Sequence, residues 1–407
     1  METNLRLYPY FTVLFNTLFW TPVFFLYFNE RVALAEVFIL QALYYFFVVI
    51  FEVPSGYFSD RYGRKLTLII ACIAFVISHG IFYLSHQFWT LLLAQVGLAI
   101  GFSFYSGTNH SLLYDSLTYL GREEEFGLRE QSANSIGLFC RSLACILGGL
   151  VAMYGLENPY GLTAITSLLA LGVCFCFIEP QKDDGDIKPG ASITKDFFTQ
   201  IKSCVLLLQR QKELRWLFVF MLIFIVFVHI PFEFFQSYIK LLDLQWTGIE
   251  NETTLTAGMI PAIGMFLAAW VSRYSIQISQ KIGVLNLLWV SLACEVLIAV
   301  GMAAILHPGI ILLILCRNIP RGLMHAPFTD KVNQYIDRSR RATFFSLNSL
   351  AGRIAYGGML MLLSTFSIGK GHPDWTTLST ILWFSSFLGA LCLLGLYLYK
   401  SPHRSRS

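Results

Sequence analysis

The sequence predicts an all-α, polytopic membrane protein whose twelve transmembrane helices form two pseudo-symmetric six-helix bundles. Composition is the first observation: 56% of the 407 residues are hydrophobic and only 13% are charged, whereas about a quarter of the residues in ordinary soluble domains are charged. The second is the length of the apolar stretches, because about 20 helical residues cross a hydrocarbon core. The third is an internal repeat. These observations argue against a soluble enzyme and against a disordered chain.

The apolar stretches define each expected element in order. Residues 1–178 form the first bundle, with spans expected at 7–28, 33–58, 66–85, 88–118, 131–154 and 158–178. Residues 179–213 are the long polar stretch, and an apolar face there predicts a cytoplasmic linker with an amphipathic helix, formed by Ile193, Phe197, Ile201, Val205 and Leu208. Residues 214–400 form the second bundle, with spans expected at 214–240, 253–277, 283–303, 308–332, 341–366 and 376–399. Residues 401–407 form a cytoplasmic tail.

The basic residues orient this arrangement. Most of the 29 Lys and Arg residues fall on one side of the predicted spans, and only Arg31, Lys240 and Lys370 fall on the other. Since basic residues are retained in the cytoplasm, both termini are expected there. Short loops, short termini and the lack of trafficking signals favour a bacterial cytoplasmic (inner) membrane.

The two halves carry matching motifs. Gly107-x-x-His110 followed by Asp115 recurs as Gly322-x-x-His325 followed by Asp330. Ser132-x-Asn134-Ser135 likewise recurs as Ser346-x-Asn348-Ser349. Both matches fall in the spans that a duplication would pair, so the halves are predicted to be repeats.

A specific motif connects the second and third spans. It reads Gly-Tyr-Phe-Ser-Asp-Arg-Tyr-Gly-Arg-Lys, with key residues Gly56, Asp60, Arg61, Gly63, Arg64 and Lys65. The pattern is typical of a tight cytoplasmic turn in which glycine permits a left-handed backbone. It resembles the loop signature of the major facilitator superfamily, and the span count, linker and repeat extend that resemblance over essentially the whole chain.

The resemblance implies a gating motif. Asp60 would face the start of the eleventh span near Arg341, and Arg64 would pair with Asp115 at the end of the fourth span. Such contacts would stabilise an outward-open state. The alternative is a basic loop that only fixes topology. The resemblance also implies a monomer that works by alternating access.

Four arginines lie within predicted spans, where a charge is costly unless it faces a cavity or a partner. They are Arg141, Arg317, Arg321 and Arg353. Guanidinium groups bind carboxylate or phosphate in a bidentate manner, so these residues predict an anionic substrate. Structural ion pairs are the alternative, with Glu36, Glu52, Asp115, Glu233 and Glu295 as candidate partners. Of these, Glu295 is expected to be a paired structural acid.

The seventh span places His229 and Glu233 one helical turn apart. A histidine beside a carboxylate predicts a proton-coupling pair, although Glu233 could instead pair with Lys240 at an outer gate. In the first bundle, Trp20 and Tyr105 could contact a ligand, and ordinary core packing is the alternative for both.

Taken together, the residues predict a secondary active transporter for a small organic solute. The favoured substrate is an anion, such as a carboxylate-bearing metabolite or a siderophore-like chelator, and H⁺ is the expected coupling ion. The alternatives are a proton-driven efflux pump for amphipathic drugs and a non-transporting, transporter-like receptor or accessory subunit. No catalytic motif, metal site or cofactor motif is present in the sequence, so neither enzymatic activity nor a cofactor is expected, and nothing indicates nucleic-acid binding.

Overall fold

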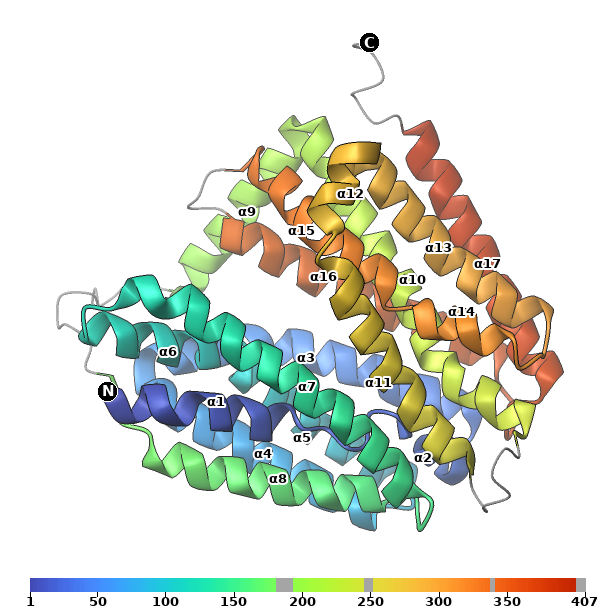
Figure 1. Cartoon of the computed structure of the whole chain (residues 1–407), viewed down its shortest axis with the longest axis horizontal. Helices are drawn as coiled ribbons and strands as arrows, with labels where there is room; N and C mark the ends of the chain where they lie inside the picture. Colours follow the sequence, from blue (N-terminus) through green and yellow to red (C-terminus); the bar gives the residue numbers. More distant parts are fainter. Residues whose placement is uncertain (181–192, 245–251, 337–340, 400–407) are drawn as a thin grey trace. The chain divides into compact units, whose positions relative to one another are not determined.

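The computed structural model of the protein describes residues 1–180, 193–244, 252–336 and 341–399 (Figure 1). Within these ranges the regular secondary structure is helical and contains no strand. The predicted all-α class is therefore confirmed.

The chain divides into two compact units. The first comprises residues 1–189, 245–262 and 368–372, and the second comprises residues 190–244, 263–367 and 373–407. The predicted domain boundaries at 178, 213 and 400 stay a prediction.

The first half of the chain contains eight α-helices and a short 3₁₀ turn, η1 (Glu123–Glu125), among its described residues. The helices are α1 (Glu2–Asn16), α2 (Phe24–Arg31), α3 (Leu34–Tyr62), α4 (Arg64–Leu84), α5 (Phe88–Tyr105), α6 (Thr108–Tyr119), α7 (Phe126–Ala152) and α8 (Asn158–Cys176). Helix α1 lies beside α6, α7 and α8 (Figure 1).

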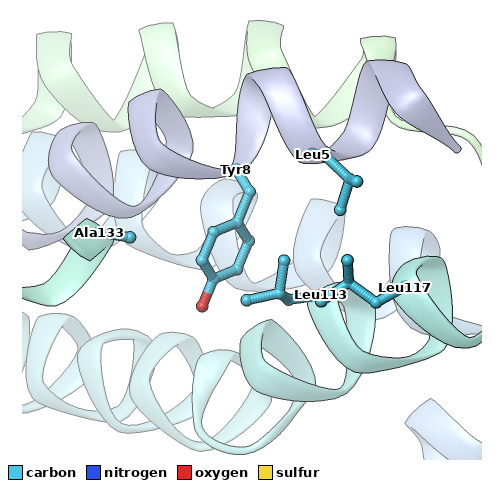
Figure 2. Close-up of a cluster of buried hydrophobic side chains, with 5 residues drawn as sticks. All are labelled: Leu5, Tyr8, Leu113, Leu117 and Ala133. Carbon is cyan, nitrogen blue, oxygen red and sulfur yellow. The ribbon is translucent and has the colours of Figure 1, made fainter. Parts of the chain in front are cut away.

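A small apolar cluster joins three of these helices. Leu5 and Tyr8 of α1 pack against Leu113 and Leu117 of α6 and against Ala133 of α7 (Figure 2). Each of the five is at most 4% exposed. Because lipid tails are as apolar as leucine, such clusters stabilise a membrane protein mainly through close packing rather than through the exclusion of water.

The second half of the chain contains nine described helices. They are α9 (Ile193–Arg210), α10 (Lys212–Leu242), α11 (Glu252–Ser272), α12 (Ser275–Ile282), α13 (Val284–Ala304), α14 (Ile310–Cys316), α15 (Ile319–Asn333), α16 (Arg341–Phe366) and α17 (Trp375–Leu398). Helix α13 packs against α10, α12, α14, α15 and α17.

Nine helical segments of the described chain are long and apolar enough to cross a membrane. A multi-pass membrane protein is therefore supported. The remaining predicted spans correspond to α1 with α2, to α14 with α15, and to α16. The count of twelve is thus established only in part.

Three of the expected spans contain a break between two helices. Residues 7–28 split into α1 and α2, residues 88–118 into α5 and α6, and residues 308–332 into α14 and α15. Gly107 separates α5 from α6 with a φ of +78°, a conformation that favours glycine. Pro320 lies in the first turn of α15, where proline starts a helix and cannot continue one from before. The expected span at 253–277 is also shorter, because α11 ends at Ser272.

The linker helix forms inside the predicted polar stretch as α9. Cys204 and Leu208 are buried, whereas Val205 is 39% exposed. An apolar side chain that faces lipid is exposed in the protein alone, so the predicted membrane-facing side of this helix stays a prediction. The side chains of Ile193 and Phe197 lie outside the described ones.

Candidate functional site

Gly63 forms the whole connection between α3 and α4. Its φ of +102° lies in the region that favours glycine. A Cβ atom at this position would lie 2.7 Å from the carboxyl carbon of Glu179. Gly63 is therefore required both by the turn and by the close approach of a carboxylate. No such crowding surrounds Gly56 in the described part of the chain.

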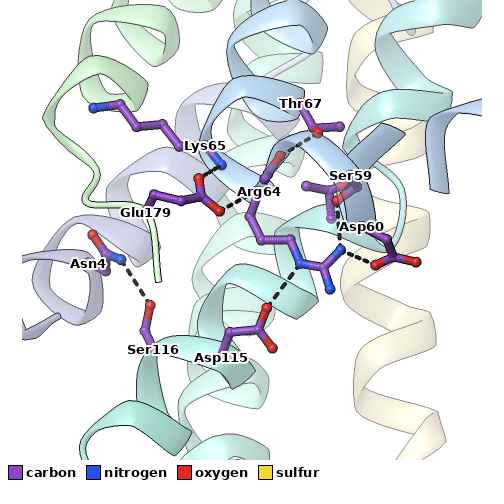
Figure 3. A network of polar contacts seen from close by, with 11 residues as sticks. Asn4, Ser59, Asp60, Arg64, Lys65, Thr67, Asp115, Ser116 and Glu179 are labelled. Atoms are coloured by element: carbon purple, nitrogen blue, oxygen red, sulfur yellow. Dashed lines mark hydrogen bonds and ion pairs between the residues drawn. The ribbon is translucent and has the colours of Figure 1, made fainter. Parts of the chain in front are cut away.

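Arg64 ties three helices together at this turn (Figure 3). Its Nε donates to Asp115 Oδ2 at 3.0 Å, and its Nη1 donates to Asp60 Oδ1 at 2.7 Å and to Ser59 Oγ at 2.9 Å. The Arg64 side chain is only 14% exposed. The Arg64–Asp115 pair expected from the sequence is thus present, and it links α4 to α6. Its gating role stays a prediction.

The turn has a further partner that the sequence analysis missed. Glu179 follows α8, and its Oε1 and Oε2 accept hydrogen bonds from the backbone N–H groups of Arg64 and Lys65, each at 2.7 Å (Figure 3). A carboxylate at this position satisfies unpaired N–H groups and complements the positive end of the α4 dipole. The only sequence signal is an acid directly after a span, which does not reveal a partner 115 residues away.

The segment leading to Glu179 is held as well. Lys65 Nζ donates to the carbonyl oxygen of Phe175 at 2.8 Å. Asn4 bonds both backbone groups of Ile178: its Nδ2 donates to the carbonyl at 2.7 Å, and its Oδ1 accepts from the N–H at 2.8 Å. Residues 175–179 are therefore fixed to α1 and α4.

Arg61 lies apart from the Arg64 network. Its guanidinium donates to the hydroxyl of Tyr57 at 2.6 Å, and its side chain is exposed. The expected approach of Asp60 to the start of α16 stays a prediction.

We expect Glu179→Ala to lower the free energy of unfolding by about 1–2 kcal/mol, since the change leaves two N–H groups at the start of α4 without their acceptor. Thermal unfolding of the purified protein measures the loss. Glu124→Ala is the matched control, because Glu124 is exposed and its loss should fall within about 0.5 kcal/mol of zero. Equal melting temperatures for the two variants would contradict the capping role.

Arg317 lies at the two-residue interruption between α14 and α15. It is 4% exposed, and its Cζ lies 4.4 Å from the ring centre of Phe235 and 5.0 Å from that of Phe232. Its backbone N–H bonds the carbonyl three residues back, at Ile314. Such tightened turns inside a helix often mark functional positions.

Helix α11 passes close to the same interruption. A Cβ atom at Gly264 would lie 3.0 Å from the Leu315 carbonyl oxygen, and one at Gly322 would lie 3.1 Å from the Ala268 carbonyl oxygen. Both distances are shorter than ordinary packing allows, so glycine at these positions lets the two backbones approach.

His229 and Glu233 are connected through Tyr356 of α16, which the sequence analysis missed. The ring of Tyr356 lies 4.7 Å from that of His229, and its hydroxyl donates to Glu233 Oε2 at 3.0 Å. His229 Nδ1 lies 2.6 Å from the Ile225 carbonyl oxygen, so this nitrogen carries a proton and donates it to that carbonyl. The histidine and the carboxylate thus belong to one polar cluster.

The other three predicted arginines differ in their surroundings. Arg321 is exposed one turn after Arg317, and Arg353 is half-buried on α16, three residues before Tyr356. Arg321 and Arg317 both lie close enough to His229 to interact with it electrostatically. Arg141 is half-buried on α7 in the first compact unit, and its convergence with the others stays a prediction.

Tyr105 and Trp20 are packed within the first unit. The Tyr105 hydroxyl accepts hydrogen bonds from Asn16 at 2.8 Å and Asn109 at 3.1 Å, and its ring stacks on Phe15 with centroids 4.0 Å apart. Trp20 lies between α1 and α2 and stacks on Tyr160 with centroids 5.9 Å apart. These contacts agree with core packing, and a ligand role for either residue stays a prediction.

Residues 10–358 match the family profile described as Major Facilitator Superfamily. This match covers most of the chain, so the protein belongs to the Major Facilitator Superfamily. It is accordingly a multi-pass membrane transporter rather than an enzyme.

Individual relatives agree on the class. A 135-residue stretch is 33% identical to an uncharacterized transporter of Buchnera aphidicola subsp. Baizongia pistaciae (strain Bp), and it covers 33% of this chain and 31% of that protein. The chain thus matches about a third of that relative's length.

Solved structures show the same fold. The nucleoside transporter NupG superposes with a TM-score of 0.76 at 15% identity, covering 98% of this chain and 100% of that one. A bacterial homologue of the human lysosomal transporter Spinster gives 0.70 at 15% identity, covering 98% of each chain. A peptide transporter POT in complex with sulfate gives 0.71 at 13% identity, covering 97% of this chain and 93% of that one.

Proposed function

We propose that the protein is a secondary active transporter that moves a small organic anion across the membrane by alternating access. The observation that carries the proposal is Arg317, a guanidinium that is 4% exposed at the interruption of a segment that the sequence predicts to span the membrane. A carboxylate-bearing metabolite or chelator is the favoured substrate.

The cost of burying a charge supports a functional reason for Arg317. Placing a charged side chain at the centre of the bilayer costs free energy, roughly 3 kcal/mol for arginine on insertion scales. Two aromatic faces offset part of this cost through cation–π attraction. The start of α15 contributes a further partial positive charge directly after Arg317. Both positive features favour an anion, which a planar guanidinium can bind through two parallel hydrogen bonds.

We propose that protons drive this transport through the cluster of His229, Tyr356 and Glu233. Tyr356 donates a hydrogen bond to Glu233 and its ring lies against that of His229, so one cluster holds two groups that can take up or release a proton. The charge distribution of the sequence supports both termini in the cytoplasm, and the proposed site of action is a bacterial inner membrane. The monomeric state rests on family resemblance.

A thermal-shift panel on the purified protein tests the substrate class. The probes are citrate, succinate and inorganic phosphate as anions, tetraphenylphosphonium as an organic cation, and a neutral amphiphile. A ligand at about 100 times its dissociation constant stabilises the fold by roughly 2.7 kcal/mol. We expect the anions alone to raise the melting temperature. If only the cation or the amphiphile does so, efflux of amphipathic drugs replaces anion transport as the proposed function.

A probe that shifts the melting curve is then assayed for flux in proteoliposomes, and binding without flux would indicate a receptor.

A further inference from the structure

Glu295 of α13 is a buried carboxylate for which the described residues provide no hydrogen-bond donor. Its side chain is 0% exposed, and neither Oε1 nor Oε2 has a hydrogen-bond partner in the described part of the chain. No ion pair of Glu295 occurs there either, so the expectation of a paired structural acid is wrong for these residues. The hydroxyl of Ser291, one turn earlier on the same helix, is also buried and has no hydrogen-bond partner among the residues that the structure describes.

The helices packed against α13 supply few charges near Glu295. The cationic side chains that interact electrostatically with Glu295 are Arg317, with the larger effect, and Arg321. Helix α17 carries no charged residue or histidine, and neither does α14. The thiol that interacts with Glu295 is that of the preceding residue, Cys294.

Most of the remaining titratable groups of the neighbouring helices are engaged elsewhere or lie toward helix ends. On α10, His229 bonds the Ile225 carbonyl and Glu233 accepts from Tyr356. The other charged groups lie toward helix ends: Lys212, Glu213, Arg215 and Lys240 of α10, Lys281 of α12, and Asp330 and Lys331 of α15. The remaining titratable groups are His325 in the middle of α15, Tyr238 of α10, and Cys392 and Tyr397 of α17. Arg317 is therefore the principal counter-charge available to Glu295.

The physical cost of ionisation decides which form of Glu295 is stable. An ionised carboxylate buried without hydrogen bonds costs several kcal/mol, and a group in this situation takes up a proton instead. The neutral acid removes the charge and needs only one modest acceptor. Because neither oxygen of Glu295 has a hydrogen-bond partner among the described residues, a movement that brings the guanidinium of Arg317 to it would favour the ionised form.

We propose that Glu295 is a proton-binding site of the transporter, neutral in this conformation and ionised when Arg317 approaches it. On ionisation the Oε–H bond breaks, the proton passes to water as hydronium, and the electron pair stays on the carboxylate, whose charge the guanidinium balances. An anionic substrate and the Glu295 carboxylate then compete for Arg317, so binding of the anion is linked to uptake of one proton. Only this link to transport rests on the proposed function, and proton binding at Glu295 stands without it.

Infrared difference spectroscopy tests the proposal with protons as the only ligand. A protonated acid without hydrogen bonds absorbs at the high-frequency end of the carboxylic C=O region, and the band shifts in ²H₂O. An ordinary glutamate is ionised at about pH 8. We expect the full-length protein in lipid to keep such a band at about pH 8, and we expect Glu295→Gln to lose it completely.

The controls separate Glu295 from other acids. Glu124→Gln removes an exposed glutamate and should leave the band unchanged. Glu295→Met is the second variant, since an apolar side chain of similar size should replace a neutral acid without loss of the fold. A wild-type spectrum without the band, or a band that persists in both Glu295 variants, would overturn the proposal. The anion panel is independent: if the band is present but no anion stabilises the protein, the proposed substrate class fails and the proton site stands.

Discussion

Replacing Arg317 with glutamine is expected to abolish stabilisation by anions while leaving the protein folded. Loss of one partner from a buried charge pair weakens binding by about 2–5 kcal/mol, or roughly 30- to 5,000-fold. The fold should persist because the change removes a buried charge that is costly to desolvate and because α14 and α15 keep their backbone interruption. The measurement is the shift in melting temperature against the concentration of citrate or inorganic phosphate.

The other arginines provide matched comparisons for this prediction. Arg321→Gln removes an exposed guanidinium one turn along the same helix, so we expect a smaller loss of affinity, within about tenfold. Arg353→Gln tests the half-buried arginine of α16. If Arg317→Gln and Arg353→Gln both retain wild-type affinity for the anions, the idea of an anion pocket is wrong.

Arg64→Ala is expected to reduce both stability and transport. The change removes charge-assisted bonds to Asp115 and Asp60 and a bond to Ser59. Fully buried pairs cost about 3–5 kcal/mol when one partner is removed. We expect about 2–3 kcal/mol here, because the Asp60 side chain is 53% exposed and therefore well solvated. Thermal unfolding measures the stability, and cysteine-alkylation accessibility measures the conformational equilibrium.

Two further variants identify the reason for the Arg64 effect. Arg64→Lys keeps the charge but cannot donate through a planar fork, so we expect partial recovery. Arg61→Ala removes a neighbouring exposed guanidinium and should change stability by less than about 0.5 kcal/mol. If Arg64→Ala lowers stability without altering the alkylation pattern, the turn has a structural role and the gating interpretation fails.

The fold class could be predicted from the sequence because it depends on the hydropathy and charge of many residues taken together. Apolar stretches and charge placement indicate membrane helices regardless of any single contact. The Arg64–Asp115 pair could be predicted for another reason: a short motif fixes Arg64 beside a helix end, and the resemblance indicates the helix that carries its partner.

The interruptions could not be predicted in this way, because a break depends on local backbone geometry. The repeat pairs Gly107 with Gly322, yet only Gly107 has a positive φ. Gly322 lies within α15, and the interruption of that span comes earlier, before Pro320. Hydropathy does not reveal where each helix breaks, because both stretches are apolar on either side of the break.

The partners of the candidate site were hidden for a related reason. Tyr356 and Glu179 act on residues far away in the chain, and neither belongs to a recognisable motif. Glu295 shows the opposite error: an acid in a span suggests a nearby cation, but only packing reveals that its oxygens have no donor among the described residues.

The position of Glu179 determines how the gene could be divided into two co-expressed fragments. A first fragment that stops at Ile178 would end at the residue whose backbone Asn4 binds. It would also lack the Glu179 carboxylate, which accepts hydrogen bonds from the first backbone N–H groups of α4. Extending it by two residues, to Pro180, restores that carboxylate and moves the charged new C-terminus beyond it. The first half of the sequence therefore has its natural end after its last membrane helix, at the residue that caps α4.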